Sequence, residues 1–255
     1  MVLARFRMPA FAVTFGAVAL ALPLSLAVPA QAAAGADGGG RGPASARPGA
    51  PAVINNPFFA GYQASVAPGS ATSSVAQFKV PRLSCTTAFR AIALGIGVQV
   101  NNFRSFSAAS VFTGCHRGRA VFFPVLLING NEVNYTTTSL RAGDVIKVSV
   151  KVTTRGTTVQ VTDVTTGVTK RRTGSGARSS SAFVGDNSWS ANGTTPLGVP
   201  GFGTLTFTSC LVDGSALARS HPARYQLVNS RNVVQIATGA LSPGGTAFAT
   251  HYRHF

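Results

Sequence analysis

From Val145 to Val152, polar and apolar residues alternate one by one, and this period-two pattern is the feature that most constrains the fold. The segment from Thr157 to Val164 repeats the pattern, and Thr165-Thr166-Gly167 then leads to Val168-Thr169-Lys170-Arg171. Successive side chains of a β-strand point to opposite faces of a sheet, so the alternation predicts strands with one buried face. Turn residues recur about every 8–12 positions, which is typical of an all-β sandwich.

Other segments extend this interpretation. Val121 to Ile128 is almost wholly apolar, as in a strand covered on both sides, and Asn129-Gly130 is a hairpin turn signal. Gly203 to Leu211 and Val233 to Ala237 predict further strands, and the basic and aromatic end of the chain, 251–255, resembles a terminal edge strand. The chain has one glutamate, Glu132, which excludes a coiled coil or a helix bundle with Glu/Lys-rich faces. We therefore expect two packed antiparallel sheets.

The N-terminus has the features of a secretory signal peptide. Arg5 and Arg7 precede an apolar run from about Phe11 to Val28, and Ala30-Gln31-Ala32 supplies a small-x-small cleavage site. We predict a signal peptide over residues 1–32 and therefore a secreted, extracellular protein with no membrane attachment after cleavage. The alternative for the apolar run is an uncleaved membrane anchor.

The next segment, 33–52, is rich in Ala, Gly and Pro and cannot form a core, so it predicts a disordered spacer. The β-sandwich domain is then expected over residues 53–255. Removal of the signal peptide would lower the formal net charge from +16 to +14, because it takes away two arginines and no acid.

Secretion permits disulfides, and the chain has three cysteines, Cys85, Cys115 and Cys210. We favour a bridge between Cys85 and Cys115, which flank the strand region 91–112; a pair that uses Cys210 is the alternative. Neither the cysteines nor the four histidines have metal-ligand spacing, and no phosphate-binding loop or nucleophile elbow is present. We expect neither a metal nor a cofactor.

The order of motifs resembles the glutamic peptidases, or eqolisins, and is most similar to a secreted actinobacterial branch of that family. The motifs are Gly61-Tyr62-Gln63-Ala64-Ser65, Phe78-Lys79-Val80-Pro81, Ala142-Gly143-Asp144-Val145-Ile146-Lys147-Val148, Val164-Thr165-Thr166-Gly167 and Phe202-Gly203-Thr204-Leu205-Thr206-Phe207-Thr208. Together they span about residues 56–217. The resemblance implies a concanavalin A-like double-sheet β-sandwich, in agreement with the periodicity.

The resemblance also implies a catalytic glutamine and glutamate on one concave sheet face, but this chain departs from both motifs. Phe112, in Val111-Phe112-Thr113-Gly114, stands in the place of the glutamine, and Ala182, in Ser181-Ala182-Phe183, stands in the place of the glutamate. A general base contributes about 10²–10⁴ in rate and an oxyanion donor about 10²–10³. Phenylalanine and alanine supply neither, so the family dyad is predicted to be absent and both side chains are expected to face the groove.

Two carboxylates are fallback candidates for catalysis. Asp186 lies close in sequence to the missing glutamate, but Asp186-Asn187 also fits an Asx-type turn. Glu132 follows the Asn129-Gly130 turn and equally fits an electrostatic pairing role. The only tryptophan, Trp189, is either a binding platform for a sugar or peptide or a core residue.

The basic surplus suggests an anionic partner, and Arg171, Arg172 and Arg178 form the densest basic stretch. No nucleic-acid-reading motif accompanies it, so sequence-specific nucleic-acid binding is not expected. Two hypotheses follow. One is a monomeric, non-catalytic secreted protein that binds an extracellular peptide, glycan or anionic polymer in the groove; the other is an acid-active endopeptidase with relocated catalytic groups.

Overall fold

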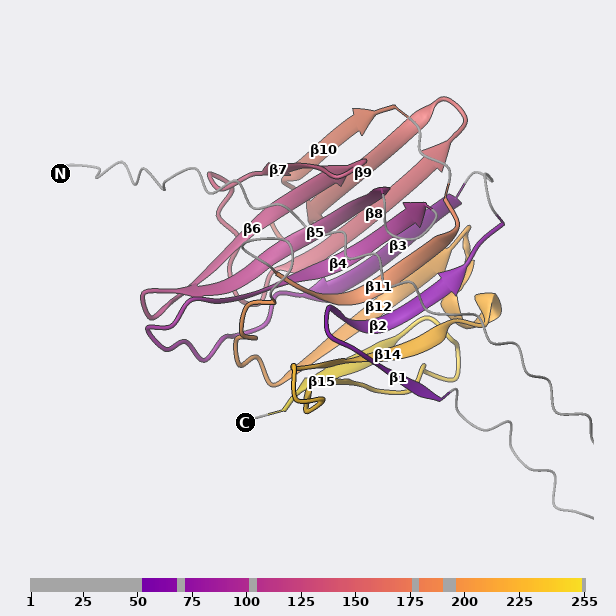
Figure 1. Ribbon diagram of the computed structural model, residues 1–255. Helices are drawn as coiled ribbons and strands as arrows, with labels where there is room; N and C mark the ends of the chain where they lie inside the picture. The colour runs from indigo at the N-terminus through magenta and orange to yellow at the C-terminus, as the bar shows by residue number, and fades with distance from the viewer. Residues whose placement is uncertain (1–51, 68–71, 101–104, 176–178, 190–195, 254–255) are drawn as a thin grey trace, which may run out of the picture.

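The computed structural model describes residues 52–67, 72–100, 105–175, 179–189 and 196–253 (Figure 1). The predicted signal peptide, Arg178 and nearly all of the predicted spacer lie outside the described residues. Within them, one four-residue 3-10 helix, η1 (Leu217–Ser220), accompanies the strands. The strands are β1 (Val53–Asn56), β2 (Phe59–Ser65), β3 (Thr72–Lys79), β4 (Arg90–Val100), β5 (Ser105–His116), β6 (Arg119–Ile128), β7 (Asn131–Asn134), β8 (Val145–Thr153), β9 (Gly156–Asp163), β10 (Thr169–Gly174), β11 (Ser181–Ser188), β12 (Thr204–Val212), β13 (Ser215–Ala216), β14 (Ala223–Val228), β15 (Val234–Thr238) and β16 (Phe248–Tyr252).

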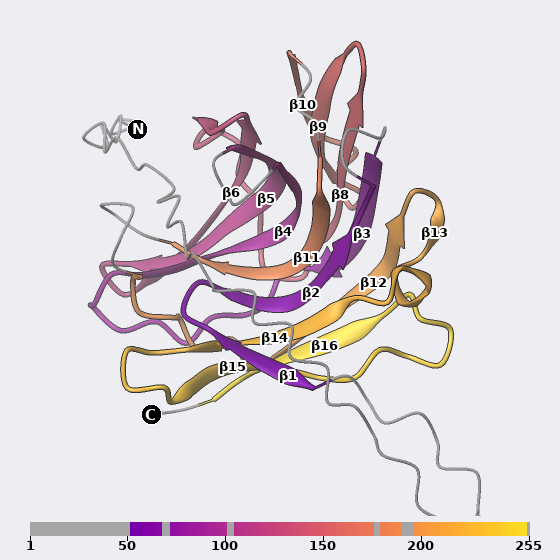
Figure 2. The ribbon, with the colours of Figure 1, turned by 45° about the vertical axis from the view of Figure 1, so that its right-hand side comes forward.

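Fourteen strands pair in one path, β10-β9-β8-β3-β12-β16-β15-β14-β2-β11-β4-β5-β6-β7, which folds back on itself, while β1 pairs with β14 and β13 with β12. We call β10-β9-β8-β3-β12-β16 the β8 layer and β2-β11-β4-β5-β6-β7 the β4 layer. Strands of the two layers lie close together, among them β4 with β8 and β5 with β9 (Figure 2). The architecture is therefore the predicted all-β sandwich.

The main core lies between the layers. Ile92, Leu94 and Ile96 of β4 are fully buried, as are Val148 and Val150 of β8, and all five belong to one hydrophobic cluster. The alternation of β8 decides its orientation, because the residues between the valines, including the lysines, point to solvent. Burial of the inward-facing valines removes that face of β8 from water, and this fixes the register of the strand.

The hairpin signal at Asn129-Gly130 is confirmed. Both residues have positive φ, 50° and 79°, between strands β6 and β7. Strand β6 is buried along its second half, as its apolar run predicted.

The expectation of an edge strand at the C-terminus is wrong. Strand β16 pairs with β12 on one side and with β15 on the other. Alternation encodes which faces a strand shows, but it carries no information about whether both edges are paired.

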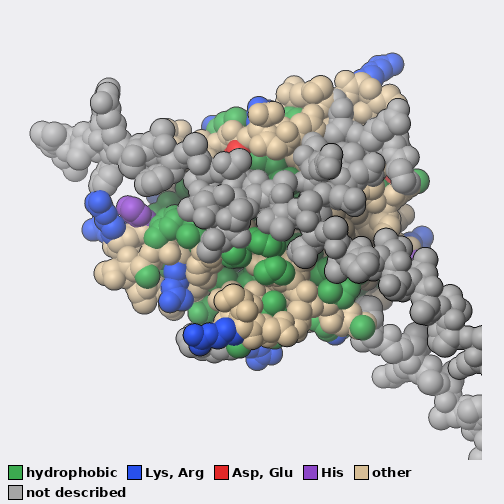
Figure 3. Space-filling model, viewed as in Figure 1, with side chains coloured by type: hydrophobic (Ala, Val, Ile, Leu, Met, Phe, Trp, Pro, Cys, Tyr) green, Lys and Arg blue, Asp and Glu red, His purple; other side chains and the backbone are tan. Residues whose placement is uncertain are grey.

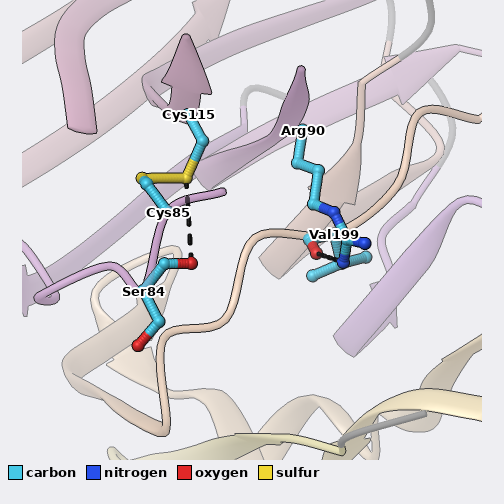
Figure 4. The surroundings of a disulfide bond; sticks show 5 residues. All are labelled: Ser84, Cys85, Arg90, Cys115 and Val199. Atoms are coloured by element: carbon cyan, nitrogen blue, oxygen red, sulfur yellow. Dashed lines mark hydrogen bonds between the residues drawn. A yellow bond between two sulfur atoms is a disulfide. The ribbon is translucent and has the colours of Figure 1, made fainter. Parts of the chain in front are cut away.

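The bridge between Cys85 and Cys115 is present, with the two Cα atoms 5.4 Å apart (Figure 4). Cys210 is a buried free thiol. Close by, Ser84 N donates to Gly201 O at 2.8 Å, and Arg90 Nη1 donates to Val199 O at 3.3 Å. These contacts hold the segment before β12 against the start of β4.

Candidate functional site

The register of the β4 layer determines which side chains share a face. Phe112 on β5 lies opposite Ala93 on β4, which lies opposite Asn187 on β11. Ala182 on β11 lies opposite Val98. Ala93 and Val98 are five residues apart along one strand, so their side chains point to opposite faces.

Phe112 and Ala182 therefore do not face one groove, and this expectation is wrong. Ala182 is fully buried in the core between the layers, whereas Phe112 belongs to a separate cluster on the outer face of the β4 layer. If the family keeps both groups on one face, a shift by an odd number of residues at one of the two motifs would account for the difference. The β11 residues that share the face of Phe112 are Ser181, Phe183, Gly185 and Asn187, and none of them is a carboxylate.

Phe112 is held in an aromatic cluster. Its ring stacks on that of Phe123 with centroids 4.5 Å apart and planes 7° apart, and it meets Trp189 edge-on at 5.0 Å. Phe112 is 5% exposed and Trp189 is 3% exposed. Trp189 is thus a packed residue of this cluster, so it is not an open platform for a sugar or peptide.

Phenyl rings also cover glycines on the same outer face. A Cβ built on Gly97 would lie 2.2 Å from Cζ of Phe183, and one built on Gly114 would lie 2.7 Å from Cε1 of Phe112. A Cβ on Gly61 would lie 2.9 Å from Cζ of Phe59. The outer face of the β4 layer is consequently lined by aromatic rings, and hydrophobic side chains gather across the middle of the side shown in Figure 3.

Asp186 does not belong to this face. Its register partner is Leu94, so its side chain points into the main core, where it is 0% exposed. Burial raises the pKa of this carboxyl to about 7, and the nearby Thr250 hydroxyl offsets part of the rise. Neither carboxylate oxygen has a hydrogen-bond partner that satisfies normal geometry. Asp186 cannot reach a substrate on the outer face.

Glu132 does lie on the outer face, at its β7 edge. It pairs with Leu127, whose side chain packs with Phe183 there. Asn134 Nδ2 donates to Glu132 Oε1 at 2.6 Å, while Oε2 is buried without a partner. Burial raises the pKa of Glu132 to about 7, and the Asn134 hydrogen bond opposes that rise.

The contact between Glu132 and Asn134 was missed from the sequence, although residues two apart on a strand share a face. It brings a carboxylate and an amide together, the two group types of the family chemistry. Glu132 lies two strands away from Phe112 and four residues further along the strand direction, so the strand spacing places the two residues about 16 Å apart.

The predicted basic residues are separated. Arg171 is exposed on the outer face of the β8 layer. Arg172 points the other way, and its Nη1 donates to Asn131 O at 2.5 Å. The structure thus brings neither arginine to Trp189.

Among the residues that the structure describes, no group of three or more His, Cys, Asp or Glu side chains could hold a metal ion. An open pocket of about 530 Å³ lies beside Ser65, Asp213 and Arg219, and it contains none of the predicted site residues. No helix in the described ranges is long and apolar enough to cross a membrane.

Residues 57–251 match the Peptidase A4 family. Scytalido-glutamic peptidase with a peptide-based transition state analogue has a TM-score of 0.62 at 16% identity, covering 77% of this chain and 100% of that one. SCP-B, an eqolisin in complex with the tripeptide Ala-Ile-His, has a TM-score of 0.58 at 17% identity, with coverages of 77% and 100%. Aspergilloglutamic peptidase from Aspergillus niger has a TM-score of 0.54 at 17% identity, with coverages of 64% and 99%. No curated protein matches.

Proposed function

The chain belongs to the Peptidase A4 family, and from this premise we propose that it is a secreted, non-catalytic member that binds peptides on the outer face of the β4 layer. One observation carries the proposal. The outward positions of β4, β5 and β11 hold no carboxylate in the part of the chain that the structure describes.

A general base and an oxyanion donor together contribute about 10⁴–10⁷ in rate. The stacked ring of Phe112 can take neither role, and Asn187 offers an amide without a carboxylate beside it. Catalytic groups of this kind fail together when one is missing, so binding is the function that the face retains.

The chemistry of the outer face favours an extended peptide with apolar side chains. Phe59 and Phe183 contact each other edge to face with centroids 5.8 Å apart, and Gln63 lies beside them with its Nε2 3.2 Å from Ser181 Oγ. Both rings are only 8% exposed, so they form the apolar floor of this face, while the partly exposed Gln63 amide supplies hydrogen bonds to a peptide backbone. Two solved structures of the same fold hold peptide ligands, one a peptide-based transition state analogue and the other the tripeptide Ala-Ile-His.

Secretion is part of the proposal. The Cys85–Cys115 bridge is typical of an oxidising compartment. N-terminal sequencing of the protein from culture medium tests this, and we expect the mature chain to begin near residue 33.

The test of function measures binding and cleavage in parallel. The mature protein is incubated with denatured haemoglobin from pH 2 to pH 8, and its binding to a library of short apolar peptides is measured. We expect binding without cleavage, and weaker binding after Phe183→Ala. If wild-type protein cleaves haemoglobin and both Glu132→Gln and Asp186→Asn cleave it equally well, the activity comes from a contaminating protease.

The Glu132–Asn134 contact favours a second candidate, an endopeptidase with relocated catalytic groups. A general base must be deprotonated, and a pKa of about 7 keeps Glu132 largely protonated in acid. Activity from this pair would therefore rise toward neutral pH, in contrast to the acid optimum expected from the family resemblance. Cleavage at pH 7–8 that disappears in Glu132→Gln but persists in Asp186→Asn would establish this candidate over the non-catalytic one.

A further inference from the structure

Three of the four lysines of the chain lie on one face of the molecule. Lys79 on β3 and Lys147 and Lys151 on β8 are exposed and point outward from the β8 layer. Arg171 on β10 points to the same side, because it pairs with Gln160, and Gln160 pairs with Ser149 between the β8 lysines.

These lysines do not protect a sheet edge. Charged residues often block edge strands from pairing with other chains. Strand β8, however, pairs with both β3 and β9, and β3 pairs with both β8 and β12. The three lysines therefore stand away from the sheet edge, where that explanation does not apply, whereas Arg171 lies on the edge strand β10.

The register gives the spacing of the cations. Lys147 and Lys151 are four residues apart on one strand, which is about 13 Å between their backbone positions. Arg171 lies two strands away and midway between them along the strand direction, about 12 Å from each. One small anion would contact a single cation, whereas a polymer with repeated charges would contact all of them.

The positions between the cations carry hydroxyls and amides. Gln160 Nε2 donates to Thr162 Oγ1 at 3.0 Å, and Thr162 and Thr169 share a hydrogen bond at 3.1 Å. Other outward polar residues continue these rows across the face: Ser73, Gln77, Ser149, Thr158 and Thr173. Such groups both donate and accept, as sugar hydroxyls require.

No carboxylate occupies an outward position on β3, β8, β9 or β10 in the described ranges. The acids at the ends of this face are engaged locally. Asp213 Oδ1 accepts from Ser73 N at 2.6 Å, and Asp144 Oδ2 accepts from Arg141 N at 2.7 Å. These two acids lie at the ends of the face, while its outward positions carry four cations and no carboxylate, so the charge over the face is predominantly positive.

We propose that the outward face of β3, β8, β9 and β10 binds an acidic polysaccharide. Its lysines and Arg171 pair with the repeated acid groups, and its threonine, serine and glutamine side chains contact the sugar hydroxyls between them. This site lies on the opposite layer from the peptide face and is independent of the function proposed above.

The same face lacks what a single-stranded nucleic acid would use. Bases bind on aromatic side chains, and the outward positions of these four strands hold none among the described residues. An acidic polysaccharide can bind through the charges and the polar rows that are present.

The test uses the mature protein with polygalacturonate, with uncharged amylose and with an oligothymidylate in parallel, at low and high salt. One variant carries Lys147→Gln, Lys151→Gln and Arg171→Gln. The matched control carries Arg119→Gln, Arg219→Gln and Arg231→Gln, which removes the same charge from exposed positions elsewhere. Melting curves of both variants verify that each is folded.

We expect wild-type protein to bind polygalacturonate more tightly than either other probe, and salt to weaken the complex. The first variant should lose about tenfold in affinity, which is about 1.4 kcal/mol, and the control less than twofold. Equal losses in the two variants would show that net charge alone attracts the polymer and would overturn the proposal. Tighter binding of the oligothymidylate, or no binding of polygalacturonate by wild-type protein, would also overturn it.

Discussion

The ring of Phe183 lies directly over Gly97 on the neighbouring strand, in the space that a side chain at residue 97 would need. A Cβ there would be 2.2 Å from Cζ of Phe183 and 2.9 Å from the carbonyl oxygen of Ser107. Phe183 also contacts Phe59. The glycine thus lets an aromatic ring lie flat on the sheet and sets the shape of the proposed peptide face.

Gly97→Ala should lower the free energy of unfolding by about 1–3 kcal/mol, because the added methyl group forces the ring away from a packed position. Urea denaturation of the purified protein measures this. The double variant with Phe183→Ala tests the cause, since without the ring the alanine should cost less than it does in the wild-type background. Additive losses would mean that the Ser107 carbonyl, not the ring, is responsible.

The buried carboxyl of Asp186 should make the fold more stable in mild acid. Its pKa is raised from 3.8 to about 7 in the native state, so between these values the folded protein binds more protons than the unfolded chain. The free energy of unfolding therefore falls as pH rises from about 4 to about 7, by on the order of 4 kcal/mol from this group. Melting curves across this range should show the decline.

Asp186→Asn should flatten that pH dependence, because the amide does not ionise. Glu132 contributes in the same direction, since burial also raises its pKa to about 7. Because the pKa of Glu132 rises from 4.5 to about 7, Glu132→Gln should remove a comparable part of the slope, and only the double variant should lose nearly all of it. An unchanged slope in Asp186→Asn would show that the carboxyl is solvated in solution.

Thiol titration should separate the three cysteines. Cys210 is fully buried, and burial raises the pKa of its thiol to about 12, so the native protein should react with no thiol reagent. Unfolding in denaturant should expose one thiol, and reduction should expose all three. Peptide mapping that finds Cys210 in a disulfide would contradict the bridge between Cys85 and Cys115.

The layers of the fold could be predicted from the sequence because alternation encodes the buried and exposed faces directly. The burial of β8 follows its pattern residue by residue. The path of the strands could not be predicted in the same way. Strand β16 is inserted between β12 and β15, and such pairing depends on contacts between distant segments that no local pattern carries.

The candidate site shows a sharper limit. A shift of one residue reverses the face of every side chain on a strand. The motif around Ala182 lies on strand β11, but the sequence alone does not distinguish the inward-facing Ala182 from the outward-facing Ser181 or Phe183. The absence of a carboxylate at this position does not depend on the shift, because Ser181, Ala182 and Phe183 all lack one.

Phe112→Gln should not restore proteolysis, although it places an amide at the position that the family resemblance assigns to glutamine. The facing strands offer no carboxylate to activate water, and an oxyanion donor alone contributes only about 10²–10³ in rate.

The Phe112→Gln substitution should also lower the free energy of unfolding by about 3 kcal/mol, because it removes the stack with Phe123 and buries a polar group. Phe112→Leu, which keeps an apolar side chain, should cost less. The opposite result would be haemoglobin cleavage by Phe112→Gln at any pH, with no cleavage by Phe112→Leu and none after Glu132→Gln is added. That result would show that Glu132 reaches the same substrate and that a single residue separates this protein from a peptidase.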